Sequence, residues 1–260
     1  MTTSRNAHTV EVGALDLLDL QLLNERSGRD SLPYPFMSTR PTRFEFLDEV
    51  TRYSAQLPER LRSGDLSVFA RCLDAWQHAD VTVTGHVQYV PAATPSIRVL
   101  AFQAGQSGYL LEQRADEDVL DVSTVAPSEV GAAVATAMRL EQPGRHPLVR
   151  NAEYVPTRSE AVDEDDDVVV RHGVSVERGV KVSISELSAY AQVQSNWRPS
   201  REWGVDSRKE ALIWVRIKDD GDYLGAPDRS SGIPLTASLL REQIEEMIAA
   251  DIEWLRRSSE

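Results

Sequence analysis

The sequence predicts an α+β protein with a mainly antiparallel sheet. Three observations predict this class. Segments in which apolar and polar residues alternate, as in half-buried strands, occur in both halves of the chain. Segments with apolar residues at helical spacing lie before and after them. In each half, four predicted strands are followed by a helix, and this repetition indicates a duplicated unit whose strands join in one sheet with helices packed around it.

The N-terminal segment predicts one strand and two helices. Thr9 to Gly13 has the alternation of a short strand, and a leucine-rich helix follows from Leu15 to Leu23. The segment Pro33–Phe36 cannot continue a helix, because each of its two prolines lacks an amide hydrogen and restricts the residue before it. A second helix is expected from about Arg43 to Leu57, with a break near Pro58.

A third helix and four strands follow. Phe69, Leu73 and Trp76 are at helical spacing within a helix expected over about residues 66–78. The period then changes from that of a helix to that of a strand, and a helix from Pro127 to about Leu140 closes the first half. The four strands between them are expected at Val81–Tyr89, Ile97–Ala104, Tyr109–Arg114 and Val119–Val125.

The second half repeats this outline. A hairpin turn is expected at Asp219–Asp222, and a loop at Ser230–Pro234 leads to a helix from about Thr236 to Arg257. The strands are expected at Leu187–Trp197, Glu202–Val205, Ala211–Lys218 and Tyr223–Gly225. The apolar face of the last helix contains Leu240, Ile244, Met247, Ile248, Ile252 and Leu255.

An acidic run divides the chain. Glu160 to Asp167 contains six acidic residues in eight, and such residues repel one another and favour a solvated linker. We therefore predict a single domain over residues 1–260, with halves of about 1–158 and 168–260 joined by a linker at 159–167. Binding of a cation by the acidic run is the alternative interpretation.

Composition excludes several classes of partner. The formal net charge is −13 and the pI is near 4.9, so phosphate backbones are repelled and no nucleic-acid partner is expected. No apolar run approaches the ~20 residues that span a bilayer, and Met1 to Glu11 lacks an apolar signal core. We expect no membrane insertion and a cytoplasmic location. Cys72, the only cysteine, lies in an apolar stretch that favours burial as a small hydrophobic residue.

The sequence has no recognisable catalytic motif, so an enzyme is not expected. The five histidines form neither a His-Glu-x-x-His pair nor a zinc-ligand spacing with Cys72. Gly105–Gly108 superficially resembles a nucleophile elbow, but it connects two strands and is interpreted as a hairpin turn. Asp219–Asp222 lacks the spacing of a calcium loop, and no phosphate-binding loop is present. We predict no catalytic residues, no metal ligands and no cofactor.

One loop is the candidate partner-binding site. It joins two predicted strands, and its two prolines make it stiff and unable to donate to a neighbouring strand. A plain connection is the alternative interpretation. The candidate residues are Val90, Pro91, Ala92, Ala93, Thr94, Pro95 and Ser96. Trp197, Trp203 and Trp214 are expected in the core, although aromatic residues are also enriched at interfaces.

The order of these segments resembles the EspG family, the chaperones of mycobacterial-type type VII (ESX) secretion. The resemblance covers nearly the whole chain and depends on order and spacing. It includes the Pro-Tyr-Pro-Phe segment at 33–36 and the passage from helix to strand at Phe69–Val83. Val125–Val130 is similar to the family's helix entry, and Trp203–Ser207 is similar to a turn in its C-terminal half. The dense acidic run departs from the family's pattern.

The resemblance implies a fold and a function. The fold is a quasi-two-fold layout with a central twisted sheet flanked by helical bundles. The function is that of a cytosolic chaperone that binds the helical tip of a secreted substrate, a PE–PPE heterodimer or another ESX client in actinobacteria. The hairpin equivalent to residues 90–96 reaches toward the client in that family. A small-molecule-binding or hydrolytic α+β domain, with a site in a sheet–helix cleft, is the alternative hypothesis.

Overall fold

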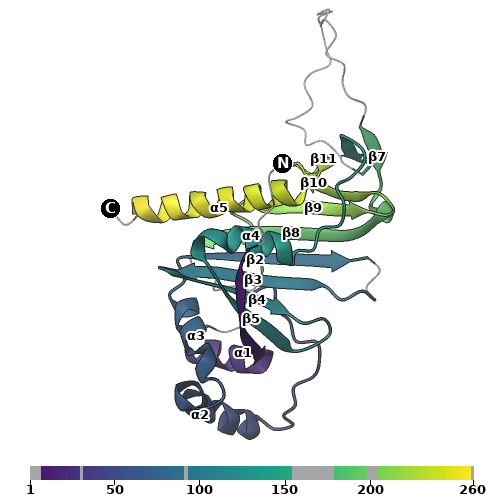
Figure 1. Cartoon of the computed structure of the whole chain (residues 1–260). Coiled ribbons are helices and arrows are strands. Elements are labelled where there is room, and N and C mark those ends of the chain that lie inside the picture. The colour runs from purple at the N-terminus through teal and green to yellow at the C-terminus, as the bar shows by residue number, and fades with distance from the viewer. Residues whose placement is uncertain (1–6, 30–31, 91–92, 154–178, 198–203, 259–260) are drawn as a thin grey trace, which may run out of the picture.

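The structure is a computed structural model that describes residues 7–29, 32–90, 93–153, 179–197 and 204–258. Its centre is one 11-stranded sheet with the order β1-β5-β4-β3-β2-β8-β9-β10-β11-β6-β7 (Figure 1). The strands are β1 Thr9–Asp16, β2 Val81–Tyr89, β3 Ile97–Ala104, β4 Ser107–Gln113, β5 Val119–Val125, β6 Val149–Asn151, β7 Val180–Val182, β8 Leu187–Trp197, β9 Leu212–Ile217, β10 Gly221–Gly225 and β11 Ser231–Pro234. The helices are α1 Leu17–Arg26, α2 Leu47–Ser63, α3 Ala70–Gln77, α4 Val130–Ala137 and α5 Ala237–Ser258.

The structure confirms the predicted fold class, which is a mixed α+β fold with a large, mainly antiparallel sheet. Neighbouring strands are antiparallel except β6 and β7, which are parallel. β2 and β8 pair in the middle of the sheet, in a register that runs from Val81 opposite Trp197 to Tyr89 opposite Ala189. Strands from both predicted halves therefore share one sheet.

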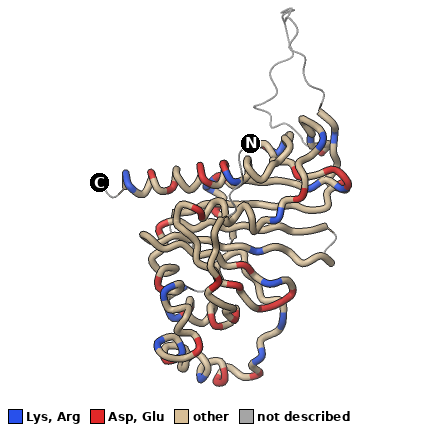
Figure 2. Tube along the Cα trace, viewed as in Figure 1, with Lys and Arg blue, Asp and Glu red and all other residues tan. Residues whose placement is uncertain are grey.

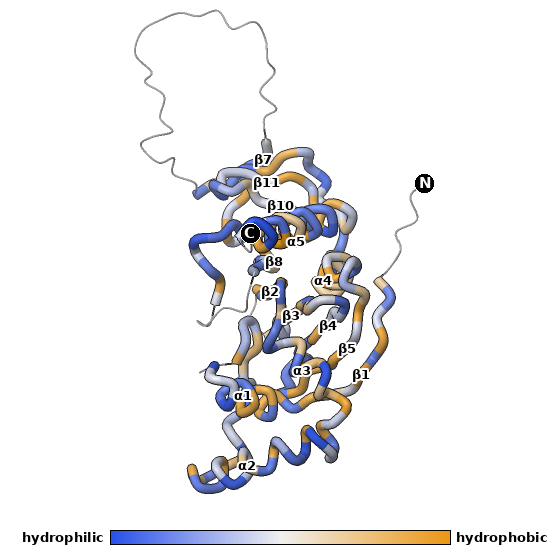
Figure 3. Tube along the Cα trace, turned by 90° about the vertical axis from the view of Figure 1, so that its left-hand side faces the viewer, coloured by the Kyte–Doolittle hydropathy of each residue, from blue (hydrophilic) through white to orange (hydrophobic). Residues whose placement is uncertain are grey.

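The two faces of the sheet are covered differently. On one face α4 and α5 pack together against the apolar side chains of β2, β3 and β8, such as Val83, Ala101 and Val193. On the other face α1 and α3 pack over β3, β4 and β5, and α2 lies against this layer (Figures 1 and 3). The strand residues buried under α1 and α3 are Leu100, Phe102, Tyr109, Leu111, Leu120 and Val122. Because successive side chains of a strand point to opposite faces, the same strands contribute apolar residues to both layers.

The predicted break near Pro58 is wrong, because α2 runs through this residue. Pro58 removes one backbone donor, but the side chains around it hold the helix in place. Leu57 is fully buried. Arg60, one turn further on, bonds to Asp19 and Asp65 through its guanidinium group. These tertiary contacts outweigh the local cost of the proline.

Five further segments differ from the predictions. The expected loop at residues 230–234 contains β11, which pairs with β10 and β6. α4 ends at Ala137, earlier than expected, and Arg139 then adopts a left-handed backbone with φ of 51°. The short strands β6 and β7 were not predicted. Gly204 and Val205 belong to no strand, and the rest of the strand expected at 202–205 lies outside the described residues, as does the acidic run at 159–167.

Charged residues lie mainly on the helices and connections, and the middle strands carry few of them (Figure 2). Asp and Glu outnumber Lys and Arg by 41 to 28 over the whole chain. No helix in the described part of the chain combines the length and the apolar character needed to cross a lipid bilayer.

Candidate functional site

The face of β8, β9 and β10 opposite α5 has no helix over it among the described residues. Strand alternation places Tyr190, Ile213 and Val215 on this face, because Trp214, between the last two, is buried on the α5 side. These side chains are half-buried. They line an apolar groove of about 470 Å³, together with Val90, Val149, Val182, Ile184, Leu187, Ile217 and several polar residues of β6 and β11.

The rim of this groove exposes large apolar side chains to solvent. The exposed fractions are 65% for Ile184 and 49% for Val90. Val149, Ile217 and Tyr223 form a small buried cluster beneath, separate from the two main cores. Since exposed apolar groups that line a common groove are typical of binding surfaces, this face is the candidate functional site.

The predicted contact loop lies beside this face. It joins β2 to β3, as predicted, and the backbone N–H of Val90 donates to the carbonyl of Ser188 at 2.8 Å. This bond fixes the start of the loop against β8. Val90 lines the groove, whereas Thr94 lines a different pocket on the other side of the sheet. Ala93 is exposed and Pro95 and Ser96 are half-buried, whereas Pro91 and Ala92 lie outside the described residues.

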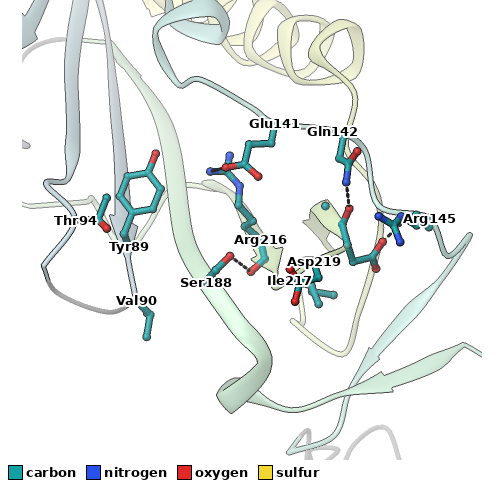
Figure 4. Close-up of a pocket in the computed structure, with 12 residues that line it drawn as sticks. Tyr89, Val90, Thr94, Glu141, Gln142, Arg145, Ser188, Arg216, Ile217 and Asp219 are labelled. Carbon is teal, nitrogen blue, oxygen red and sulfur yellow. Dashed lines mark hydrogen bonds and ion pairs between the residues drawn. The ribbon is translucent and has the colours of Figure 1, made fainter.

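The second pocket, of about 650 Å³, is polar (Figure 4). It lies between the end of the sheet and the segment that follows α4, and Arg216 and Ser188 point toward it beside Glu141 and Asp219. Val90 and Ile217 line both pockets. The loop at residues 90–96 therefore begins between an apolar pocket and a polar one.

Arg216 in the polar pocket is paired with two carboxylates of the chain. Arg216 Nε donates to Asp222 Oδ1 at 2.8 Å, and its Nη1 donates to Glu141 Oε1 at 2.9 Å. Burial lowers the pKa of Arg216, but the hydrogen bonds and charges of Asp222 and Glu141 outweigh burial and raise the pKa overall. Burial and a hydrogen bond to Asp220 raise the pKa of Tyr223 to about 12. The guanidinium group of Arg216 is therefore already paired with carboxylates of this chain.

The remaining side chains that could take part in catalysis or metal binding do not come together in the described part of the chain. Within the described ranges, no three His, Cys, Asp or Glu residues are placed to hold a metal ion. Cys72 is buried, as predicted, and burial raises the pKa of its thiol to about 12. Gly105 has a φ of 55° in the hairpin between β3 and β4, so the elbow-like segment is a turn. His172 lies outside the described residues.

The tryptophans of the second half differ from one another. Trp214 is in the core, as predicted. Trp197 stacks on Trp254 of α5 with ring centroids 4.1 Å apart, and Lys209 lies over its ring. Trp203 lies outside the described residues. Trp197 therefore helps to hold the last turns of α5.

A polar cluster at the border of the open face was not predicted. His86 on β2 pairs with Arg98 on β3 and with Gln192 on β8. Gln192 Nε2 donates to the hydroxyl of Tyr34, whose ring meets His86 edge-on at 6.2 Å between centroids. The alternation of β2 shows in the sequence that His86 shares a face with Thr82, Thr84 and Gln88. The partners across the strands depend on the register, which the sequence does not reveal.

Neither a search against models of known protein families nor a search of curated proteins found a match to this chain.

Proposed function

We propose that this chain is a cytosolic chaperone of type VII (ESX) secretion, similar in role to the EspG family. It binds a secreted client protein non-covalently, keeps the client soluble and directs it to its secretion system. The client is a PE–PPE heterodimer or another ESX substrate. The observation that carries this proposal is the apolar groove on the open face of β8 to β10, beside the loop at residues 90–96.

The groove has the character that client binding requires. The exposed tip of a helical client is apolar, and its burial stabilises a complex by about 25 cal/mol per Å² of apolar surface, before the costs of association. Val90 and Ile184 provide an apolar rim. Arg150, Asn151 and Ser183 provide polar groups at the groove for selectivity.

The strand order supports a duplicated unit. On one side of the β2–β8 pair the order is β3, β4, β5, and on the other side it is β9, β10, β11. Each series of four strands, β2 to β5 and β8 to β11, is followed in the chain by a helix, and these helices, α4 and α5, pack against each other. A quasi-two-fold arrangement of this kind is what the resemblance implies.

Co-expression tests the proposal. The chain is expressed together with each ESX substrate encoded beside its gene, and soluble substrate and complex are measured after purification. The expected result is a monodisperse complex and more soluble substrate than without the chain. If no substrate gains solubility or co-purifies, the chaperone function is refuted.

The polar pocket favours a second candidate function, a small-molecule-binding or hydrolytic domain. Its position between the sheet and the segment after α4, with Glu141, Asp219 and Arg145 in its lining, fits a polar ligand. Against this, Arg216 is already neutralised by Asp222 and Glu141. A thermal-shift screen with metabolites and metal ions separates the two functions, since only a ligand-binding domain gives a rise in Tm of several degrees with a small molecule.

A further inference from the structure

The apolar groove has two arginines in its lining. Arg150, on β6, and Arg229, in the turn between β10 and β11, are the only charged residues of the described chain that line it, and both are exposed. The polar pocket, by contrast, is lined by Glu141, Asp219 and Asp220 as well as by two arginines. Over the whole sequence acidic residues outnumber Lys and Arg by 41 to 28. The groove is therefore locally basic within an acidic chain.

The backbone holds both arginines on the same side of the groove. Arg229 has a φ of 62°, and its N–H donates to the carbonyl of Ala226 at 2.8 Å within the turn. Its own carbonyl accepts from Asn151 Nδ2 at 3.3 Å, and Asn151 follows Arg150 on β6. Arg150 in turn lies opposite Ser231 of β11. The β6–β11 side of the groove therefore carries both cations on a fixed backbone.

The carboxylates closest in sequence to the groove residues bond to the chain's own groups. Glu153 Oε1 accepts from the Ser183 hydroxyl at 2.6 Å, and Glu186 Oε2 accepts from the Ser183 N–H at 2.8 Å. Asp228 Oδ1 accepts from the N–H of Ser230 at 3.0 Å. None of these three carboxylates lines the groove. They hold the connections around it and leave its lining positive.

The other side of the groove is apolar. Val90 follows β2, Tyr190 is on β8 and Ile213 is on β9, whereas the arginines belong to β6 and the β10–β11 turn. The sheet order β2-β8-β9-β10-β11-β6 separates the two groups (Figure 1). A segment that is complementary to this groove has apolar side chains toward β8 and β9 and acidic ones toward β6 and β11. Such complementarity of charge mainly sets specificity, orientation and association rate.

We propose that the client segment that docks in this groove carries acidic side chains beside its apolar ones, and that Arg150 and Arg229 bind them. This inference rests on the proposed function and names the chemistry of the client's docking segment. The planar guanidinium group of an arginine can donate two parallel hydrogen bonds to one carboxylate. Because both arginines are exposed, each pair adds modestly to affinity and serves mainly to select and orient the client.

Three helical peptides test the charge of the docking segment. The first is acetyl-Ala-Glu-Leu-Leu-Ala-Glu-Leu-Leu-Ala-Glu-Leu-Leu-Ala-amide, and the other two have Gln or Lys in place of every Glu. Affinity for the full chain is measured by isothermal titration, and the helicity of each peptide by circular dichroism. We expect the Glu peptide to bind at least roughly threefold more tightly than the Gln peptide, and the Lys peptide to bind most weakly. The preference for Glu should shrink as sodium chloride is added.

Substitution of the two arginines assigns the preference to the groove. In the double variant Arg150→Gln and Arg229→Gln, the ratio of Glu to Gln affinity should fall to about one, and each single variant should give an intermediate ratio. Both positions are exposed, so the variants should unfold at the wild-type temperature. Arg71→Gln, at an exposed position on α3, is the matched control and should keep the wild-type ratio. A preference for Glu that persists in the double variant overturns the proposal.

The acidic run at residues 160–167 is the competing occupant, because in sequence it lies between β6 and β7. The same titrations are repeated after its replacement by a Gly/Ser spacer of equal length. We expect the preference for Glu in both proteins. A preference that appears only after the replacement assigns the two arginines to the chain's own acidic run and contradicts the proposal.

The outcomes separate this inference from the chaperone function. Equal affinity of the Glu and Gln peptides for the wild type, or no binding of any of the three, refutes the inference even where an ESX substrate co-purifies. A preference for Glu that is lost in the double variant supports it even where no ESX substrate co-purifies, and in that case the chaperone function alone is refuted.

Discussion

On one face of the sheet, helices cover β3 to β5, whereas no helix of the described residues covers β8 to β10. In the closed region α1 and α3 cover Leu100, Phe102 and Tyr109, which are almost completely buried. In the open region Tyr190, Ile213 and Val215 point to the same side of the sheet but remain half-buried. The first region obtains its cover from its own chain, through the helices before β2.

The difference shows what an incomplete apolar layer implies. Both regions contain side chains that water solvates poorly, at strand positions that point away from α4 and α5. Only in the closed region does the described part of the chain provide the second layer. A groove with Ile184 65% exposed at its rim is a surface that gains from being covered by another molecule.

The largest expected effect of a mutation lies in the closed region. Phe102 is fully buried and contacts the rings of Trp76 and Tyr109, at centroid distances of 5.3 and 5.4 Å. Phe102→Ala leaves a cavity there, and the free energy of unfolding is expected to fall by ~3–5 kcal/mol. The matched change in the open region, Ile213→Ala, is expected to cost less than about 1.5 kcal/mol, because this side chain is only half-buried. Urea unfolding measures both, and equal losses contradict the comparison.

A substitution in the contact loop should change client binding more than it changes the stability of the chain. Pro95→Asp places a charge in a half-buried position of the loop beside the groove. We expect binding of a co-purified client to weaken by ~1–3 kcal/mol, with a change in unfolding free energy below about 1 kcal/mol. Isothermal titration and thermal unfolding measure the two quantities. Unchanged affinity removes this loop from the interface and leaves the groove as the remaining candidate.

His86, at the border between the two regions, should make the free energy of unfolding depend on pH. The pKa of His86 falls from the ordinary value of 6.5 to about 4 in the folded chain, first because of burial and second because of Arg98. The unfolded chain therefore binds a proton more readily, and stability present above pH 6.5 is lost as the pH falls toward 4. After allowance for partial exposure, the loss is ~1–2 kcal/mol.

His86→Gln is the variant that isolates this effect. It keeps a polar side chain on the open face but does not titrate, so its unfolding free energy should decline less than that of the wild type over the same pH range. Denaturant unfolding at several pH values between 7 and 4 measures the difference. Parallel curves for the two proteins contradict the assignment to His86.

Much of the sheet could be predicted because its strands alternate clearly. The predicted bounds of β2, β3, β5 and β8 coincide with the structure. These strands are long and carry a period of two over seven residues or more. The short strands β6 and β7, of three residues each, contain too little sequence to show a period, and they form by pairing with each other and with β11.

The candidate site was predicted less completely, for a different reason. Val90 was identified from the two prolines that follow it in the loop. Ile184 and Ile213 line the same groove but lie far along the chain, and only the β2–β8 and β8–β9 pairings bring them close to Val90. The same is true of Arg98 and Gln192, which meet His86 through the register of two strand pairs. Register depends on long-range contacts that a single sequence does not display.

The most direct test of the central claim compares two exposed apolar positions by titration against an ESX substrate that co-purifies with the chain. Ile184 lies at the groove, whereas Val68 lies near α3 and is similarly exposed, at 58%. We expect Ile184→Asp to weaken binding by about tenfold or more, while Val68→Asp binds like the wild type. Wild-type affinity in Ile184→Asp, with Val68→Asp equally unaffected, would show that the client does not bind at the groove.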